Sequence, residues 1–229
     1  MFKENILKVV VFDLGGTLMQ YIGMPYSWVD FYYQGFKAIA EKYCSDFSPD
    51  KIQASVDILK QFNPRVNYRE NEYSAEYIFS TALEAWKLNV SIQECIETFW
   101  KSLNLKAEIY DDTISVINEL KHKGYAIAVL TDLPNAMPDY IFKKDIEELL
   151  SCFDFYVSSS VAGYRKPNIA GLKMISDKFN TSLCDLIFIG DEEKDRQTAI
   201  NANCKFIKID RTKTRDNSID SLFALLNIL

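Results

Sequence analysis

The chain has 229 residues, of which 48% are hydrophobic and 25% are charged, a composition typical of a globular protein with a sizeable core. The formal net charge of -6 argues against nucleic acid or a membrane surface as the main partner. No apolar run approaches the about 20 residues of a membrane-spanning helix. The five cysteines contain no C-x-x-C pair. Such a dispersed, odd set is typical of reduced, buried thiols, so we expect a cytoplasmic protein.

The first predicted element is a buried strand, "LKVVVF" at residues 7–12, which is followed directly by Asp13. From residue 19 to about 105 the strand pattern stops and helical patterns follow one another. "SPDKIQASVDILKQF" places a serine N-cap before a proline at the first helical position. We therefore predict an all-helical domain, residues 19–105, inserted after the first strand.

Two further features of this insert bear on its structure. "SIQECIETFWKSL" begins with a capping box formed by Ser91 and Glu94. The aromatic residues of the insert fit a core, except that Tyr21, Tyr26 and Trp28 lie nearest the exit of the first strand. We expect these three side chains to face a functional site.

After residue 105, strands and helices alternate. Four more apolar runs predict strands, at residues 125–131, 153–159, 185–190 and 205–210. Their apolar character is nearly continuous, which suits a parallel sheet covered on both faces. The sequence thus predicts an α/β fold, a doubly wound parallel (Rossmann-like) sheet of about five strands formed by residues 1–18 and 106–229. We expect its last helix, residues 218–229, to begin with Ser218 as the N-cap.

Polar side chains follow the strands at their carboxyl ends, where open parallel sheets bind ligands. The set comprises Asp13, Thr131, Asp132, Lys166, Asp191 and Asp195. Phosphoryl transfer needs these types: a carboxylate can attack phosphorus, while a lysine and a divalent ion neutralise the charge. Mg²⁺ prefers carboxylate and other oxygen ligands. The one histidine, His122, lies at a predicted helix end, which argues against histidine-based catalysis.

Four segments lie at these strand ends in chain order: "FDLGGTL" (12–18), "AVLTD" (128–132), "SSVAGYRKPNIAGL" (159–172) and "IFIGDEEKDRQTAINA" (187–202). In this order and spacing they resemble the four motifs of the haloacid dehalogenase-like hydrolase superfamily. The helical insert resembles the cap domain that such proteins carry between the first and second motifs. The resemblance covers nearly the whole chain.

The resemblance implies a role for each matching residue. Asp13 would be the nucleophile, and Thr131 and Lys166 would bind the phosphoryl group. The implied Mg²⁺ ligands are Asp13, the carbonyl of Gly15, Asp191 and Asp195, the last of which would alternatively orient Lys166. The residues expected beside the substrate are Gly16, Thr17, Asp132 and Arg165. The implied substrate is a small phosphorylated metabolite, bound by a monomer or homodimer.

Gly15 departs from the pattern of the family's phosphatases, which have a second aspartate at this position. That aspartate protonates the leaving oxygen and later activates water. Losing a positioned general acid–base typically costs on the order of 10²- to 10⁴-fold in rate. We therefore expect slow turnover that favours substrates with good leaving groups, such as acyl or aryl phosphates.

Gly15 also keeps other readings open. A degenerate protein would bind a phosphorylated ligand or a partner without turnover. A phosphonatase would cleave a carbon–phosphorus bond through an imine on a lysine of the insert, for which Lys37, Lys42 and Lys51 are candidates. Dehalogenation needs no Mg²⁺ and would leave the acidic cluster unexplained.

Overall fold

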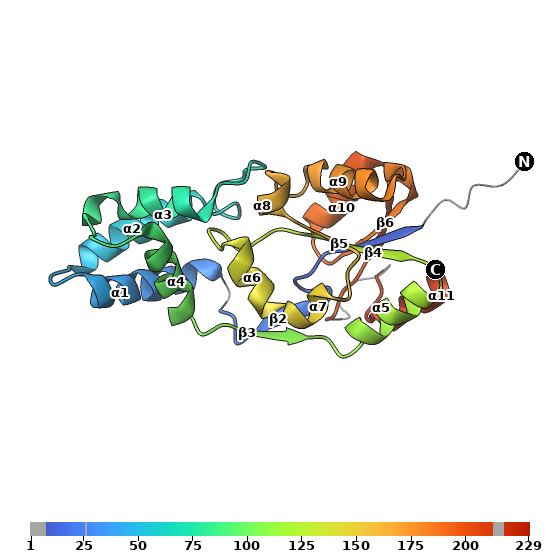
Figure 1. The fold of residues 1–229 in the computed structure, drawn as a ribbon, viewed down its shortest axis with the longest axis horizontal. Helices are drawn as coiled ribbons and strands as arrows, with labels where there is room; N and C mark the ends of the chain where they lie inside the picture. The colour runs from blue at the N-terminus through green and yellow to red at the C-terminus, as the bar shows by residue number, and fades with distance from the viewer. Residues whose placement is uncertain (1–7, 26, 213–217) are drawn as a thin grey trace, which may run out of the picture.

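The computed structural model describes residues 8–25, 27–212 and 218–229. Leu7, the first residue of the predicted first strand, and Tyr26 lie outside the described residues. The chain forms two lobes, one of helices and one of a sheet covered by helices, which lie side by side in Figure 1. We call them the helical lobe and the sheet lobe.

The sheet lobe contains five strands in the order β5-β4-β1-β6-β7, and every neighbouring pair is parallel. The strands are β1 (Val9–Phe12), β4 (Ala126–Thr131), β5 (Phe155–Ser158), β6 (Leu186–Gly190) and β7 (Lys205–Lys208). This confirms the predicted doubly wound parallel sheet. Because β1 lies between β4 and β6, the residues that follow these three strands meet at one edge.

Alternate residues of β1 point to opposite faces of the sheet. Val9 and Val11 belong to an apolar cluster with residues of α9 (Ala170–Phe179) and α10 (Glu193–Ala202). Val10 and Phe12 pack on the other face, which α5 (Thr113–His122) and α11 (Leu225–Ile228) cover (Figure 1). All four side chains of β1 are fully buried, which explains the continuous apolar run.

The remaining short elements of the sheet lobe are α6 (Asp139–Asp145), α7 (Glu147–Leu150), α8 (Ser159–Ala162), η3 (Leu183–Asp185) and η4 (Leu222–Ala224). The prediction that Ser218 caps the last helix is wrong. Ile219 is extended and pairs with the strand-like Ile209, so the helical turn starts later. Ser221 caps it instead, accepting a hydrogen bond from the N–H of Phe223 at 3.2 Å.

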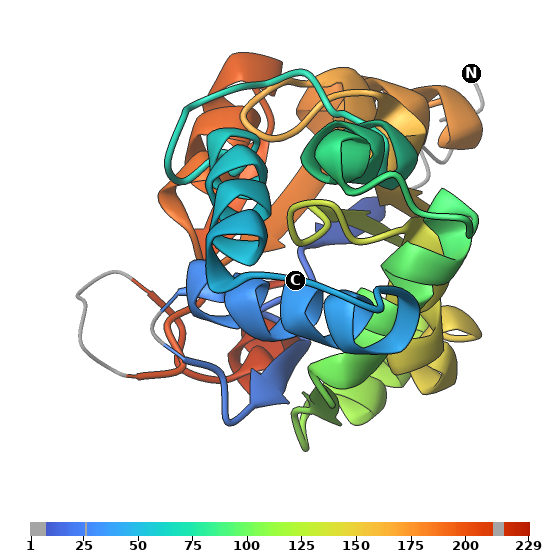
Figure 2. The ribbon, with the colours of Figure 1, turned by 90° about the vertical axis from the view of Figure 1, so that its left-hand side faces the viewer.

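The helical lobe is built from α1 (Tyr32–Tyr43), α2 (Pro49–Gln61), α3 (Ala75–Leu83) and α4 (Ile92–Ser102), with the short turns η1 (Trp28–Phe31) and η2 (Glu84–Trp86). Figure 2 looks onto these helices from the end of the molecule. The predicted caps are confirmed: Ser48 accepts a bond from the N–H of Lys51 at 3.3 Å, and Ser91 and Glu94 form both bonds of a capping box.

Aromatic rings fill the centre of the helical lobe. The ring centroids of Phe36, Phe79 and Phe99 lie 5.1–5.9 Å apart. Gly35 lets α1 approach α4 closely, since a Cβ on this residue would lie 2.3 Å from the ring of Phe99. These rings belong to an apolar cluster that continues to one face of the sheet, and the distance between α1 and α4 within it depends on one glycine.

A two-stranded antiparallel sheet connects the lobes. It pairs β2 (Met19–Ile22) with β3 (Lys106–Ile109), and the sequence pattern did not predict it. Each strand has only four residues and β3 is partly exposed throughout, so neither gives the apolar run that reveals the parallel strands. The segment 19–105 is consequently not helical throughout.

Within the described ranges, no helix has both the length and the apolar character needed to cross a membrane. All five cysteines are free thiols, but the expectation that they are buried holds only for Cys95, since Cys184 is exposed and the other three are partly exposed. His122 ends α5 with its side chain 81% exposed, as expected for a solvated residue.

Candidate active site

Asp13 stands at the carboxyl end of the central strand. Its N–H donates to the carbonyl of Ile189 at 2.9 Å, so the pairing of β1 with β6 continues one residue beyond the strand. The residue is only 5% exposed. The chain then turns sharply, because the carbonyl of Leu14 accepts bonds from the N–H groups of Leu18 at 2.8 Å and Met19 at 3.1 Å. This turn directs the Asp13 carboxylate into the space beyond the sheet.

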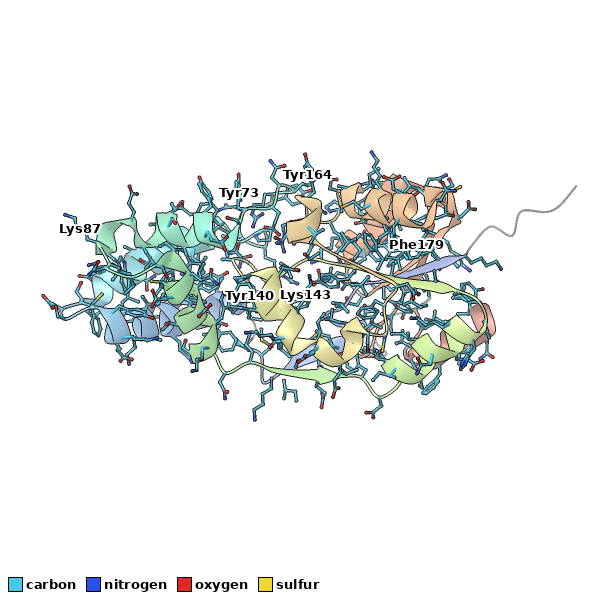
Figure 3. The ribbon with its side chains drawn as sticks, viewed as in Figure 1. Tyr73, Lys87, Tyr140, Lys143, Tyr164 and Phe179 are labelled. Atoms are coloured by element: carbon cyan, nitrogen blue, oxygen red, sulfur yellow. The ribbon has the colours of Figure 1, made fainter. Side chains whose placement is uncertain are left out.

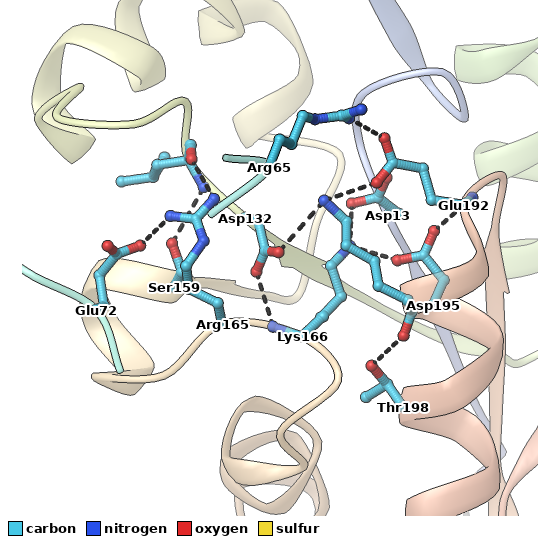
Figure 4. Close-up of polar contacts among 12 residues, drawn as sticks. Asp13, Arg65, Glu72, Asp132, Ser159, Arg165, Lys166, Glu192, Asp195 and Thr198 are labelled. Carbon is cyan, nitrogen blue, oxygen red and sulfur yellow. Dashed lines mark hydrogen bonds and ion pairs between the residues drawn. The ribbon is translucent and has the colours of Figure 1, made fainter. Parts of the chain in front are cut away.

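Lys166 lies between two carboxylates (Figure 4). Its Nζ is 2.6 Å from Asp13 Oδ1 and 2.6 Å from Asp195 Oδ1, and its side chain is 1% exposed. Burial alone would lower the pKa of Lys166, but Asp13 and Asp195 raise it well above its ordinary value. The lysine is therefore a fixed positive charge in contact with Asp13.

One lysine does not balance the carboxylates around it. Burial raises the pKa of Asp13 well above its usual range, Lys166 offsets this in part, and Asp195 and Asp191 raise it further. Burial likewise raises the pKa of Asp191 to about 6, with Asp195 contributing. The excess of buried negative charge makes this a favourable place for a cation.

The residues present fit a magnesium ion. Carboxylate oxygens of Asp13, Asp191 and Asp195 lie within 4.8 Å of one another. Among the described residues, the buried Oδ1 of Asp191 has no hydrogen-bond partner. Gly16 leaves room for this carboxylate: its φ is +74°, and a Cβ there would lie 2.3 Å from Asp191 Oδ2. An all-oxygen donor set of this kind suits Mg²⁺.

Asp195 is engaged by protein groups. Beside its contact with Lys166, its Oδ2 accepts a hydrogen bond from the N–H of Glu192 at 2.9 Å, and the residue is fully buried. Of the two roles that the sequence left open for Asp195, orienting Lys166 is the one that these contacts favour.

A second cluster surrounds Asp132. Asp132 Oδ1 accepts a bond from the Lys166 N–H at 3.1 Å, and its Oδ2 lies 3.3 Å from Nζ of Lys194. Lys194 Nζ is also 2.8 Å from Glu192 Oε2. Although burial opposes it, Lys194 and Arg65 lower the pKa of Glu192 to about 2. One oxygen of Asp132 thus contacts the backbone of Lys166, and the other contacts the side chain of Lys194.

The sequence reading did not single out Lys194. It lies in the first turn of α10, where a cation is disfavoured by the helix dipole, and that misfit is the signal that could have identified it.

The other predicted substrate contacts differ in their surroundings. Thr131 and Gly16 line the cavity described below, and so does Gly15. Thr17 is fully buried and does not line it. Arg165 lines the cavity, but its guanidinium pairs with Glu72 of the helical lobe and donates to the carbonyl of Leu133 at 2.7 Å (Figure 4).

The helical lobe contributes to the site through the α2–α3 segment, residues 62–74. Arg65 pairs with Glu192, and Arg69 lies 3.0 Å from Glu72. Both arginines line the cavity. They were not predicted from the sequence because the prediction considered residues at the ends of strands, and these two lie in a loop between helices.

The same segment is bonded to the backbone of the sheet lobe. Glu72 N–H donates to the carbonyl of Gly163 at 3.0 Å, and Arg165 N–H donates to that of Glu70 at 2.6 Å. Asn71 and Tyr164 form a β-bridge. Figure 3 shows Tyr164 on the upper edge of the molecule, where the lobes meet.

A cavity of about 760 Å³ lies between the lobes beside Asp13. Tyr21 and Trp28 line it, which confirms two of the three expected site-facing aromatics. The lysines lining it are Lys166 and Lys194, both from the sheet lobe. Lys37, Lys42 and Lys51 do not line it, so an imine on one of these lysines would form outside this cavity.

Comparison with known proteins gives one family match and several proteins of similar fold. Residues 10–209 match the family model described as haloacid dehalogenase-like hydrolase. A phosphoglycolate phosphatase of Aliivibrio fischeri is 22% identical over 206 residues, covering 89% of this chain and 83% of that protein. An HAD phosphatase structure from Thermococcus onnurineus superposes with a TM-score of 0.64 at 18% identity, covering 97% of both chains. A dehalogenase structure superposes with a TM-score of 0.59 at 15% identity, covering 100% of this chain and 99% of that one. At these identities the structures establish the fold and leave the chemistry to the site.

Proposed function

We propose that this chain, which belongs to the haloacid dehalogenase-like hydrolase family, is a Mg²⁺-dependent phosphatase of small phosphorylated metabolites. The observation that carries the proposal is the buried Lys166 held between Asp13 and Asp195, beside the unpartnered oxygen of Asp191. A lysine and a cation site around one carboxylate suit an anionic nucleophile attacking an anionic phosphate. The phosphatase named among its relatives supports the same reaction class.

The reaction takes two displacements at phosphorus. An oxygen of Asp13 attacks, the bond from phosphorus to the leaving oxygen breaks, and an aspartyl-phosphate forms. Water then attacks that phosphorus, inorganic phosphate leaves and the Asp13 carboxylate is restored. Oδ1 of Asp13 accepts a hydrogen bond from Lys166 at 2.6 Å, which would hold the carboxylate in place for attack. Lys166 and Thr131 hold the oxygens of the phosphoryl group.

The Mg²⁺ would be held by Asp13, Asp191 and the carbonyl of Gly15. Asp195 would act indirectly, by holding Lys166. When bound, the ion neutralises charge on the phosphoryl oxygens. The lack of a side chain at Gly16 leaves room for the Asp191 carboxylate, because a Cβ there would lie 2.3 Å from its Oδ2.

Residues 19–105 would form the cap that covers the substrate. Arg165 has a different role from the expected substrate contact, because its pairing with Glu72 attaches this cap to the sheet lobe. Gly16 and Thr17 would shape the phosphate end of the site through the turn that follows β1. Asp132 would do so through its contacts with Lys166 and Lys194. A cytoplasmic location and a monomeric or dimeric state remain predictions.

A second candidate is a protein that binds a phosphorylated ligand without turnover. Gly15 favours it, since no carboxylate stands where the phosphatases of the family have their acid–base. The burial of Lys166 against Asp13 favours the enzyme, because an ion pair this deeply buried is costly to maintain for binding alone.

The first prediction tests the nucleophile. Asp13→Asn removes the attacking oxygen's charge, so Mg²⁺-dependent hydrolysis of an aryl phosphate should fall by at least about 10³-fold. Steady-state rates with Mg²⁺ and with EDTA measure this, and EDTA should abolish wild-type turnover reversibly.

Asp57→Asn is the matched control, since its carboxylate is 57% exposed on α2, pairs with Lys60 and does not line the cavity. A folded Asp13→Asn protein that keeps its activity would overturn the proposal. Wild type without Mg²⁺-dependent turnover of any phosphomonoester, but with tight phosphate-ligand binding, would favour the binding protein.

A further inference from the structure

The cavity beside Asp13 has an apolar wall. It is formed by Met19, Tyr21, Met24, Trp28, Leu133 and Phe142. The wall begins next to Gly15, because Gly15 and Met19 form a β-bridge and the N–H of Gly16 donates to the carbonyl of Met19 at 2.8 Å. A group leaving from a phosphate at Asp13 past Gly15 would therefore meet apolar side chains.

The aromatic part of this wall is held in place. The Tyr21 hydroxyl donates to Asp145 Oδ2 at 2.7 Å, across from β2 to α6. The rings of Tyr21 and Trp28 meet edge to face, with centroids 5.6 Å apart. Trp28 packs in turn on Trp100 at 6.1 Å. Both cavity-facing rings are only half-buried, so they offer a preformed surface on which a flat ring could pack.

The cations of the cavity are already paired. They are Arg65, Arg69, Arg165, Lys166 and Lys194, and each has a carboxylate partner. Arg69 and Arg165 share Glu72, and these three side chains are between 7% and 12% exposed. A second anionic group on the substrate that reached Arg69 or Arg165 would have to displace the buried Glu72, at a desolvation cost, whereas Arg65 is 69% exposed.

Gly15 gives an independent reason for an aromatic leaving group. With no carboxyl group at this position, the leaving oxygen departs as an anion. A phenol, whose pKa of about 10 is that of tyrosine, forms this anion far more readily than an aliphatic alcohol does. The wall and the missing acid thus favour the same chemistry.

We infer that the substrate, under the proposed function, is a phosphomonoester of an aromatic alcohol, whose ring packs on the apolar wall. The ring lies against Tyr21, Met24 and Trp28 while the phosphate lies at Asp13. Phosphates of small carboxylic acids, which carry a second negative charge, are poor substrates by the same reasoning.

The test compares 2-naphthyl phosphate with phosphoglycolate on the full chain with Mg²⁺. We expect kcat/KM to be at least about 10-fold higher for the naphthyl ester. Met24→Lys places a charge in the wall and should lower kcat/KM for the naphthyl ester at least about 10-fold while sparing phosphoglycolate. Ile22→Lys is the matched control, because Ile22, the last residue of β2 and two residues before Met24, is 52% exposed and does not line the cavity.

Binding provides a readout independent of turnover. Calorimetry on Asp13→Asn should show tighter binding of 2-naphthyl phosphate than of phosphoglycolate, with Met24→Lys reversing the order. Turnover that favours phosphoglycolate, or Met24→Lys indistinguishable from Ile22→Lys, would overturn this inference and leave the phosphatase standing. Absence of all turnover would defeat the phosphatase, and the calorimetric order would still decide the ligand class.

Discussion

At the scale of single residues, Gly15 is the position that would decide, under the proposed function, which substrates the enzyme uses. A Cβ at this position would meet no atom within 4 Å, in contrast to Gly16 beside it, and φ is not in the left-handed region. An aspartate there is therefore compatible with the observed backbone. Its carboxyl group would lie on the cavity wall between the nucleophile and the apolar residues.

Gly15→Asp should accordingly raise the hydrolysis of an alkyl phosphate by about 10²- to 10⁴-fold, because it supplies the acid that a poor leaving group needs. Steady-state kinetics with glycerol phosphate measure the gain. Gly15→Asn, of the same shape but unable to donate a carboxyl proton, should show none. A folded Gly15→Asp enzyme with the wild-type alkyl rate would show that the missing carboxylate does not limit turnover.

The expectation that ligands bind at the carboxyl ends of parallel strands identified residues whose position follows from the sheet. Asp13, Thr131, Lys166 and Asp191 all line the cavity for that reason. Arg165 shows the limit of such reasoning. Its partner Glu72 is 93 residues away in the sequence and lies on the other lobe, so no local pattern indicates that its charge is already paired.

At the scale of elements, burial decided what could be predicted. The parallel strands are buried on both faces, and their apolar runs mark them in the sequence. β2 and β3 have one partner each and several exposed residues, so they look like connecting segments. The helix ends at Ser48 and Ser91 were predictable because capping is a local interaction.

Gly35 is an element-scale feature that can be tested. Gly35→Ala gains about 1 kcal/mol of helix propensity, but its methyl group would overlap the ring of Phe99. Overpacking of this kind costs about 1–3 kcal/mol, so we expect net destabilisation in urea unfolding. In a Phe99→Leu background the same change should cost less, which a double-mutant cycle measures. A Gly35→Ala protein clearly more stable than wild type would contradict this packing.

At the scale of the whole molecule, the lobes are connected on two sides. The β2–β3 pair joins them on one side, and the α2–α3 segment reaches the sheet lobe on the other, along the upper edge of the view in Figure 2. The cavity lies between these connections, and Arg65 and Tyr68, which line it, are exposed. The exposed Arg65–Glu192 pair is weak, whereas the contacts of Glu72 are largely buried.

The two backbone hydrogen bonds between Glu70 or Glu72 and the loop at Gly163–Arg165 have a kinetic consequence. Their amide protons are protected from exchange while these hydrogen bonds hold, so the exchange rates of the Glu72 and Arg165 amides measure how often this contact between the lobes breaks. We expect both to slow together when a phosphate ligand binds, while the Asn67 amide, bonded within its own segment, stays unchanged. Deuterium exchange followed by mass spectrometry or NMR tests this, and exchange at unprotected rates would show that the lobes are already apart in solution. If the two amides exchange at the rate of turnover, the opening of this contact, and not the proposed chemistry at Asp13, would set the speed of the enzyme.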